Sequence, residues 1–201
     1  MIEQNDHRVY SDAEKQRLTS NLAGVAAEIH GGGWNDKPAC VATLCALHAR
    51  VFAGVRDHAG RTRSKDWGTE RLVFGPNRSF HRSAVARALD EAFDSARRSI
   101  RSLQENKASP DYEHSAVYVA VWIHAEIVRI HPFEDGNGRS SRLLMAMVLV
   151  QLGLRPIPVE ATKQEYTNQL NTYFRSRTIQ PLIDLFLRIA DPGQAERPSD
   201  S

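Results

Sequence analysis

The chain has few of the features that mark membrane, secreted or nucleic-acid-binding proteins. Its longest apolar run, residues 143–150, is too short to span a bilayer, and its first residues lack the basic start and apolar core of a signal peptide. The formal net charge is only +2, and the basic residues are scattered, which argues against nucleic acid as the main partner. We therefore expect a cytoplasmic protein that binds neither membrane nor nucleic acid. Delivery into another cell by a secretion system would leave no mark among these features.

Cysteine is also scarce, with only Cys40 and Cys45 in the whole chain. Five residues apart on a helix, the two thiols would point to different faces. We therefore interpret them as buried apolar residues, not as a disulfide or a metal-binding pair. Two thiols without a disulfide framework also fit a reducing compartment.

The composition is that of one ordinary globular domain. The chain has 201 residues, of which 41% are hydrophobic and 25% charged, enough to bury a sizeable core. No internal repeat is present. The polar ends predict flexible tails at residues 1–10 and 191–201, which leaves a single domain over residues 11–190.

Most of this domain is predicted to be helical. Ser11 and Glu14 have the spacing of a capping box, which predicts a helix from Ser11 to about His30. Apolar spacing predicts six further helices, at about residues 38–54, 83–106, 115–130, 139–152, 163–175 and 181–189. The helix at 115–130 is apolar almost all round, which is typical of a central, buried helix.

One short β-hairpin interrupts the helices. Residues 55–70 have the composition of a loop, and residues 71–74 and 78–81 form two short extended runs around Gly75, Pro76 and Asn77. A Gly-Pro-Asn turn between extended runs is a weak hairpin signal. The sequence therefore predicts a mainly helical domain with one small hairpin.

A short loop between two apolar helices, residues 131–138, carries the candidate chemistry. Gly136, Asn137 and Gly138 open the helix predicted at 139–152. Glycines admit positive φ and close approach of a ligand, and successive N–H groups at a helix N-terminus form an anion nest. Arg139 and Arg142, three residues apart, share a helix face. Two guanidinium groups beside a nest suit a polyphosphate.

Two further residues of this loop have chemical potential. Asp135 precedes the nest, and Mg²⁺ typically takes one or two carboxylates together with substrate phosphates and water. His131 stands at the other end of the loop, where a neutral imidazole could accept a proton from a hydroxyl near pH 7. Pro132 and Phe133 would stiffen and anchor the loop.

Each residue also has a structural interpretation when it is taken alone. A histidine is usually structural, Gly-Asn-Gly is usually a turn, and Asp135 could be a helix cap. The conjunction of base, carboxylate, nest and two arginines favours a catalytic phosphate site. Outside this loop, three residues are interpreted as structural: His48, Trp122 and His124.

The run from His131 to Arg142 resembles the signature of the Fic family, H-x-F-x-[D/E]-G-N-G-R-x-x-R, and fills every specified position. The resemblance extends over about residues 40–190. Residues 47–52 and 59–63 look like the upstream helix and loop of the family, and residues 181–186 look like its closing helix. Residues 72–80 stand where Fic proteins have a β-hairpin flap. The resemblance implies a compact all-α fold with one small β-hairpin.

The resemblance also implies a reaction. His131 would deprotonate a Ser, Thr or Tyr hydroxyl of a target protein, which would attack the α-phosphorus of ATP and release pyrophosphate. Asp135 would bind Mg²⁺. The phosphates would be held by Gly136, Asn137, Gly138, Arg139 and Arg142. The target chain would pair with the flap in a strand-like manner, at Leu72, Val73, Phe74 and Phe80.

The choice of transferred group is narrowed by one residue. The Doc branch, which phosphorylates its targets, carries Lys where this chain has Gly138, so Gly138 favours AMP transfer. Other Fic proteins transfer another nucleotide or phosphocholine, which stays an alternative. The base pocket is expected near Tyr166, Asn171 and Phe174. A non-catalytic Fic-fold binding module would be expected to lose signature residues, and none is lost here.

Control of the reaction is a separate question. Many Fic proteins carry an inhibitory helix, [S/T]-x-x-x-E-[G/N], whose Glu pairs with the second signature arginine. Ser109 and Glu113 have this spacing, but His114 follows and Pro110 interrupts the segment. Two explanations remain: a separate small antitoxin chain whose Glu would pair with Arg142, or the absence of such control. We prefer the first.

Overall fold

The computed structural model describes residues 4–5, 9–157 and 163–190, and these form a helical fold with one small sheet. The α-helices are α1 (Asp12–His30), α2 (Val41–Val51), α3 (Val85–Glu105), α4 (Tyr112–Ile130), α5 (Asn137–Gln151), α6 (Lys163–Ser176) and α7 (Gln180–Ala190). The remaining elements are the 3-10 turn η1 (Arg82–Ala84) and the strands β1 (Gln4–Asn5), β2 (Leu72–Phe74) and β3 (Asn77–Arg78). The prediction of an all-α fold with one small hairpin is confirmed.

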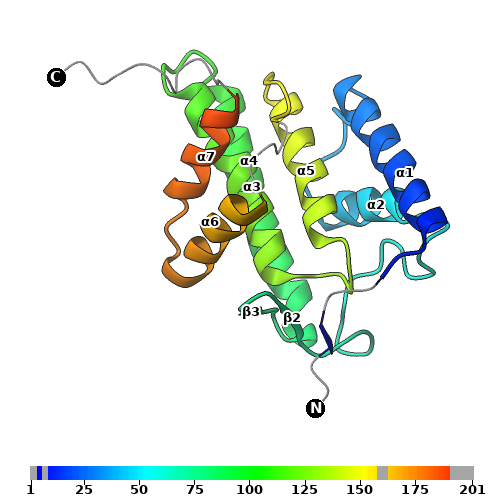
Figure 1. Ribbon diagram of the computed structural model, residues 1–201. Coiled ribbons are helices and arrows are strands. Elements are labelled where there is room, and N and C mark those ends of the chain that lie inside the picture. The colour runs from blue at the N-terminus through cyan, green and yellow to red at the C-terminus, as the bar shows by residue number, and fades with distance from the viewer. Residues whose placement is uncertain (1–3, 6–8, 158–162, 191–201) are drawn as a thin grey trace.

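Helix α4 is the centre of the fold. Helix α5 lies along α4, and α1 and α2 lie beyond α5. Helices α6 and α7 lie on the other side of α4 (Figure 1). Ala120, Val121 and Ile123 of α4 are completely buried, as expected for a helix that is apolar almost all round. The α4–α5 pair therefore holds the connecting loop between two packed helices.

The ends of the helices follow local backbone chemistry. At α1 the Ser11 hydroxyl accepts from the Glu14 N–H at 3.2 Å, and the Glu14 carboxylate accepts from the Ser11 N–H at 2.8 Å, so the predicted capping box is confirmed. Helix α2 begins later than expected because Cys40 is extended and serves as its N-cap. Helix α5 begins earlier than expected, since Gly136 is a left-handed N-cap.

The hairpin is confirmed and is joined by a strand that the sequence did not predict. β2 and β3 pair antiparallel, with Val73 opposite Arg78. β1 pairs with the other edge of β2 in parallel, with Gln4 opposite Leu72. Part of the segment predicted to be a flexible tail therefore lies on the hairpin. The predicted tail at 191–201 falls outside the described residues.

The cysteines and the apolar helices bear on two further predictions. Cys40 and Cys45 are unpaired thiols that are half-buried, less enclosed than the sequence suggested. Among the described residues, no helix combines the length and the hydropathy that crossing a bilayer requires.

Candidate functional site

The candidate site lies where α4 ends and α5 begins. His131 is the C-cap of α4 and has left-handed backbone angles, φ 57 and ψ 61. Its N–H still donates to the Ile127 carbonyl at 2.9 Å, so the chain turns sharply away from the helix axis at this residue. A left-handed conformation is uncommon for a residue with a side chain and persists only where the surroundings hold it.

Arg63 supplies that support. Its side chain is fully buried, and its Nη2 and Nε donate to the His131 carbonyl at 2.6 and 3.0 Å. The Arg63 main-chain N–H donates to the Pro132 carbonyl at 2.7 Å. The guanidinium also donates to the carbonyls of Thr69, Glu70, Phe80 and Ile130. One side chain thus joins the loop 61–70, the hairpin and the start of the site.

The imidazole of His131 is buried and fixed from two directions. Its ring stacks on Phe74 of β2, with centroids 4.1 Å apart and an interplanar angle of 13°. Its Nδ1 lies 3.1 Å from the Val128 carbonyl. A carbonyl only accepts, so Nδ1 carries a proton, and in the neutral ring Nε2 carries the lone pair. The ring is therefore held in the tautomer in which Nε2 can accept a proton.

The signature loop is closed on itself by Asn137. The Asn137 side chain accepts from the Phe133 N–H and donates to the Phe133 carbonyl, each at 2.9 Å. This side chain is buried and occupied by the loop, so only the main chain of Asn137 can contribute to an anion nest. That main chain lies in the first turn of α5, where N–H groups have no intrahelical acceptor.

His48 of α2 supports the other side of the loop. Gly60 N–H donates to its Nδ1 at 2.8 Å, so Nε2 carries the proton and donates to the Asp135 carbonyl at 3.0 Å. The ring stacks between Phe52 and Phe133. Burial lowers the pKa of His48 to about 4. His48 is thus neutral and positions the loop, in keeping with the structural role predicted for it.

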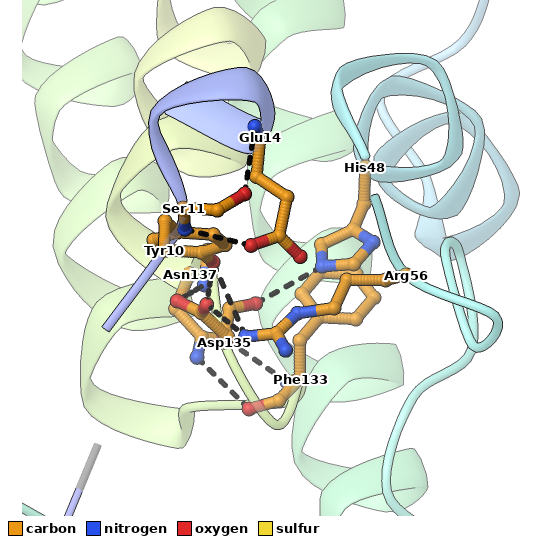
Figure 2. Close-up of polar contacts among 9 residues, drawn as sticks. Tyr10, Ser11, Glu14, His48, Arg56, Phe133, Asp135 and Asn137 are labelled. Carbon is orange, nitrogen blue, oxygen red and sulfur yellow. Dashed lines mark hydrogen bonds and ion pairs between the residues drawn. The ribbon is translucent and has the colours of Figure 1, made fainter. Parts of the chain in front are cut away.

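Asp135 is engaged by residues from three parts of the chain (Figure 2). Its Oδ1 accepts from the Gly136 N–H at 2.5 Å. Its Oδ2 accepts from Nη2 of Arg56 at 2.7 Å and from the Tyr10 hydroxyl. Arg56 lies in the segment after α2, and Tyr10 comes directly before Ser11, the N-cap of α1. The carboxylate is therefore paired with a cation supplied by the protein itself.

The two signature arginines have different surroundings. Arg139 lies over the rings of Tyr10 and Phe52, each 5.3 Å from its Cζ. Its Nη1 is buried and has no hydrogen-bond acceptor among the described residues. Nη1 of Arg142 lies 3.2 Å from where a Cβ on Gly138 would stand. A buried donor without an acceptor is costly, so Arg139 points to an anionic ligand.

Arg142 is in turn contacted by α6. It lies beside the Tyr166 hydroxyl. Burial raises the pKa of Tyr166, and the charge of Arg142 and a hydrogen bond from it partly offset that rise. Nε2 of His124 lies 2.7 Å from the same hydroxyl. His124 is fully buried, as predicted for a core residue. Tyr166, expected near the base pocket, thus lies beside a phosphate-binding candidate.

The predicted flap residues are not equivalent. Leu72 is buried in the fold, whereas Val73 and Phe74 are half-buried. Phe74 contacts both His131 and Phe174, and Phe80 lies under the guanidinium of Arg129 at 4.6 Å. On β3, Asn77 donates to Asn171 at 2.6 Å. The hairpin therefore lies next to His131, with Asn171 and Phe174 at its side.

The candidate magnesium ligand is Asp135, whose Oδ2 is already paired with Arg56 and Tyr10. Asp135 provides one carboxylate at the nest, and Mg²⁺ takes oxygen ligands. Among the described residues, no three ligating side chains gather closely enough to hold a metal ion by themselves. Phosphate oxygens and water would therefore have to complete the coordination.

Sequence reasoning identified the signature residues but missed three residues that hold them: Tyr10, Arg56 and Arg63. Arg56 and Arg63 stood in a segment interpreted as a loop, and Tyr10 in a segment interpreted as a tail. No periodicity or motif marks them, because each acts through a contact distant in sequence. A sequence signal was present only for Arg63, which belongs to the run 59–63 of the family resemblance.

Comparisons with solved structures support the fold. The BepC effector protein of Bartonella tribocorum, determined with bound AMPPNP, superposes with a TM-score of 0.66 over 89% of this chain and 86% of that one, at 18% identity. The N-terminal Fic domain of an effector from Bartonella sp. AR 15-3 gives a TM-score of 0.68 over 94% of this chain and 87% of that one, at 17% identity. At this identity the likeness concerns the fold.

Sequence comparisons identify the family. A Fido domain-containing protein of Dictyostelium discoideum is 41% identical over 66 residues, 32% of this chain and 46% of that protein. A protein adenylyltransferase Fic of Nematostella vectensis is 35% identical over 89 residues, 39% of this chain and 21% of that protein. The chain thus spans less than half the length of these relatives. The sequence model of the Fic/DOC family matches residues 38–149, more than half of the chain, and the chain belongs to this family.

Proposed function

We propose that this protein transfers AMP from ATP to a hydroxyl group of a target protein. The observation that carries the proposal is the orientation of His131. Its Nδ1 donates to the Val128 carbonyl, which leaves Nε2 as the nitrogen that can accept a proton when the ring is neutral. A short loop connects His131 to the N-terminus of α5, which carries Arg139 and Arg142. A helix N-terminus and two arginines suit a phosphate ligand.

The reaction balances with the residues present. Nε2 of His131 takes the proton of the target Ser, Thr or Tyr hydroxyl. The hydroxyl oxygen forms a bond to the α-phosphorus, the bond from that phosphorus to the β-phosphate oxygen breaks, and pyrophosphate leaves. Arg139 and Arg142, with the first-turn N–H groups of α5, would stabilise the phosphate charge. Catalysis of this kind depends on positioning and on preorganised electrostatics.

Asp135 would hold Mg²⁺ that arrives with ATP. When bound, the metal would neutralise phosphate charge and orient the departing pyrophosphate. The hairpin beside His131 would present the target chain through strand pairing at β2.

Two similarities support AMP as the transferred group. The relative from Nematostella vectensis is named as a protein adenylyltransferase, and the BepC structure was determined with AMPPNP. Gly138 supports the same choice, because the Doc branch, which phosphorylates its targets and has a similar signature, carries Lys at this position. Transfer of another nucleotide or of phosphocholine is the alternative reaction.

The test is incubation of the purified protein with ATP, Mg²⁺ and cell lysate, followed by mass spectrometry for an AMP adduct. We expect adducts with the parent protein and none with His131→Ala, whose far-UV spectrum should match that of the parent. The absence of AMP adducts on lysate proteins and on the enzyme would contradict the proposal. Adducts formed only with another labelled nucleotide or CDP-choline would support the alternative. Binding of ATP without any transfer would identify a non-catalytic module.

We also propose that a separate small antitoxin chain silences this site, through a Glu that pairs with Arg142. Co-purification of one tight, small partner with the [S/T]-x-x-x-E-[G/N] motif would support this. Full transfer activity in a partner-free protein that is harmless to its host would oppose it.

A further inference from the structure

The carboxylate of Asp135 is already occupied by protein groups. The Arg56–Asp135 ion pair measures 2.7 Å, and the side chains are only 7% and 17% exposed. The Tyr10 hydroxyl donates to the same oxygen, Oδ2, and lies 3.2 Å from Nη2 of Arg56 (Figure 2). The Gly136 N–H takes the other oxygen. Hydrogen bonds to an ionised group in a partly desolvated setting are among the stronger ones.

The two partners of Asp135 are themselves held in place. Arg56 N–H donates to the Phe52 carbonyl at 3.1 Å, which continues the end of α2. The Tyr10 ring contacts two guanidinium groups, with its centroid 5.0 Å from Cζ of Arg56 and 5.3 Å from that of Arg139. The capping box of α1 begins at Ser11, directly after Tyr10. These contacts fix both donors against the carboxylate.

This arrangement conflicts with direct coordination of Mg²⁺. The ion requires near-ideal octahedral geometry with oxygen ligands at about 2.0–2.1 Å. A guanidinium on Oδ2 repels a second cation and uses the lone pairs that the metal would need. Coordination through Oδ2 therefore requires the release of that oxygen.

A donor next to the clamp could bind the incoming phosphate. Nη1 of Arg139 is buried without an acceptor among the described residues. The Arg139 guanidinium lies over the same Tyr10 ring as that of Arg56. A phosphate oxygen that arrives with Mg²⁺ could accept from Arg139 when Asp135 is released.

We propose that Arg56 and Tyr10 form a clamp that competes with Mg²⁺ for Asp135 and thereby sets the Mg²⁺ concentration at which the nucleotide binds. The proposal rests on the proposed function, because it takes Mg²⁺ and ATP as the ligands. Arg56 and Tyr10, two residues outside the signature run 131–142, would thus control how much Mg²⁺ nucleotide binding requires.

The experiment measures binding of ATP that carries a fluorescent N-methylanthraniloyl group, at a fixed nucleotide concentration and over a range of free Mg²⁺. Arg56→Gln should lower the half-saturating Mg²⁺ concentration by about tenfold, the effect of one charged hydrogen bond. Tyr10→Phe removes only the hydroxyl and should lower it by about threefold. Affinity at saturating Mg²⁺ should not fall in either variant.

Matched controls separate the clamp from general effects. Arg50→Gln removes one charge and one ion pair, to Glu28 on α1, and Tyr112→Phe removes a hydroxyl that donates to the Leu152 carbonyl. Both should keep the parent threshold.

The possible results are distinguishable. An unchanged or raised threshold in Arg56→Gln and Tyr10→Phe overturns the clamp while leaving the proposed function intact. Loss of binding by Arg56→Gln at saturating Mg²⁺, with native thermal unfolding, also overturns it and identifies Arg56 as a phosphate ligand. If the parent binds no nucleotide at any Mg²⁺ concentration, the proposed function fails and the clamp fails with it.

Discussion

The Tyr166 hydroxyl on α6 lies 2.7 Å from Nε2 of the buried His124 on α4 and also contacts the Arg142 guanidinium. A guanidinium only donates, so the tyrosine oxygen accepts from Arg142 and its own proton goes to Nε2 of His124. Burial and, to a smaller extent, the charge of Arg142 lower the pKa of His124 to about 3. A neutral histidine therefore fixes the direction of the hydrogen bond that reaches Arg142.

Tyr166→Phe should weaken nucleotide binding without unfolding the protein. The variant keeps the ring and removes the oxygen that holds Arg142, so the affinity for fluorescent ATP at saturating Mg²⁺ should fall by about five- to tenfold, the effect of one hydrogen bond to a charged group. If binding is rapid relative to chemistry, KM for ATP should rise by a similar factor while kcat changes little. Tyr112→Phe is the control, and equal affinities for the parent and Tyr166→Phe would contradict the prediction.

Gly136→Ala should be strongly destabilising. Gly136 has φ +78, and a Cβ there would lie 2.2 Å from two ring atoms of Phe52, a fully buried side chain. Left-handed backbone costs about 1–2 kcal/mol for a residue with a Cβ, and the collision adds about 2 kcal/mol or more of overpacking. Urea unfolding should therefore show a loss of about 3 kcal/mol or more.

The matched control for this substitution is Gly153→Ala. Gly153 has a similar φ of +81, but no heavy atom of the described residues lies within 4 Å of its added Cβ. It should lose only about 1 kcal/mol, the backbone cost. Equal losses at the two glycines would show that Phe52 does not constrain the start of α5.

Arg63→Lys should also destabilise the fold. An ammonium group has three donors at one point and cannot span the carbonyls that the planar guanidinium joins. Several buried carbonyls would lose their donor, and we expect a loss of about 3 kcal/mol in the free energy of unfolding. Arg61→Lys is the control, because that side chain is exposed and its guanidinium covers the Trp67 ring, at 4.4 Å. A loss within about 0.5 kcal/mol in both variants would contradict the anchoring role of Arg63.

The sequence predicted the main helices because their apolar spacing is local. The apolar character of residues 115–130 is sufficient to make α4 central, whatever packs against it. The start of α5 was placed two residues late, because the left-handed conformation of Gly136 decides where the helix begins. That conformation depends on surroundings such as Phe52 and His48, which the local sequence does not reveal.

The candidate site shows the same division between local and distant information. His131, Asp135 and Arg139 belong to one short run and could be recognised by type and spacing. The side chains that hold these residues in position come from other parts of the chain. Arg63 and Arg56 lie in the segment after α2, and Tyr10 lies in the segment before α1. An ion pair such as Arg56–Asp135 joins positions far apart in the chain, so no local pattern predicts it.

The stability of the protein should fall as the pH drops below about 6.5. The folded-state pKa values of His48 and His124 are lowered to about 4 and about 3 from 6.5. Between pH 6.5 and 4 the unfolded chain therefore binds protons that the folded chain does not. The stabilisation is fully present above the unfolded pKa and is lost as pH falls, at about 1.4 kcal/mol per pH unit for each histidine.

His48→Gln tests how much His48 contributes to this pH dependence of stability. His48 is chosen because its Nε2 contacts the Asp135 carbonyl. Urea unfolding at pH 6.5 and pH 5 should show that the variant loses about 2 kcal/mol less than the parent across this interval. His114→Gln, at an exposed position on α4, should retain the parent's dependence. Because carboxylates titrate mostly below this interval, an identical pH slope in His48→Gln and the parent would mean that protonation of His48 does not oppose folding. The loop would then have to tolerate a charged imidazole between Gly60 and Asp135, contrary to the N–H donor that faces its Nδ1.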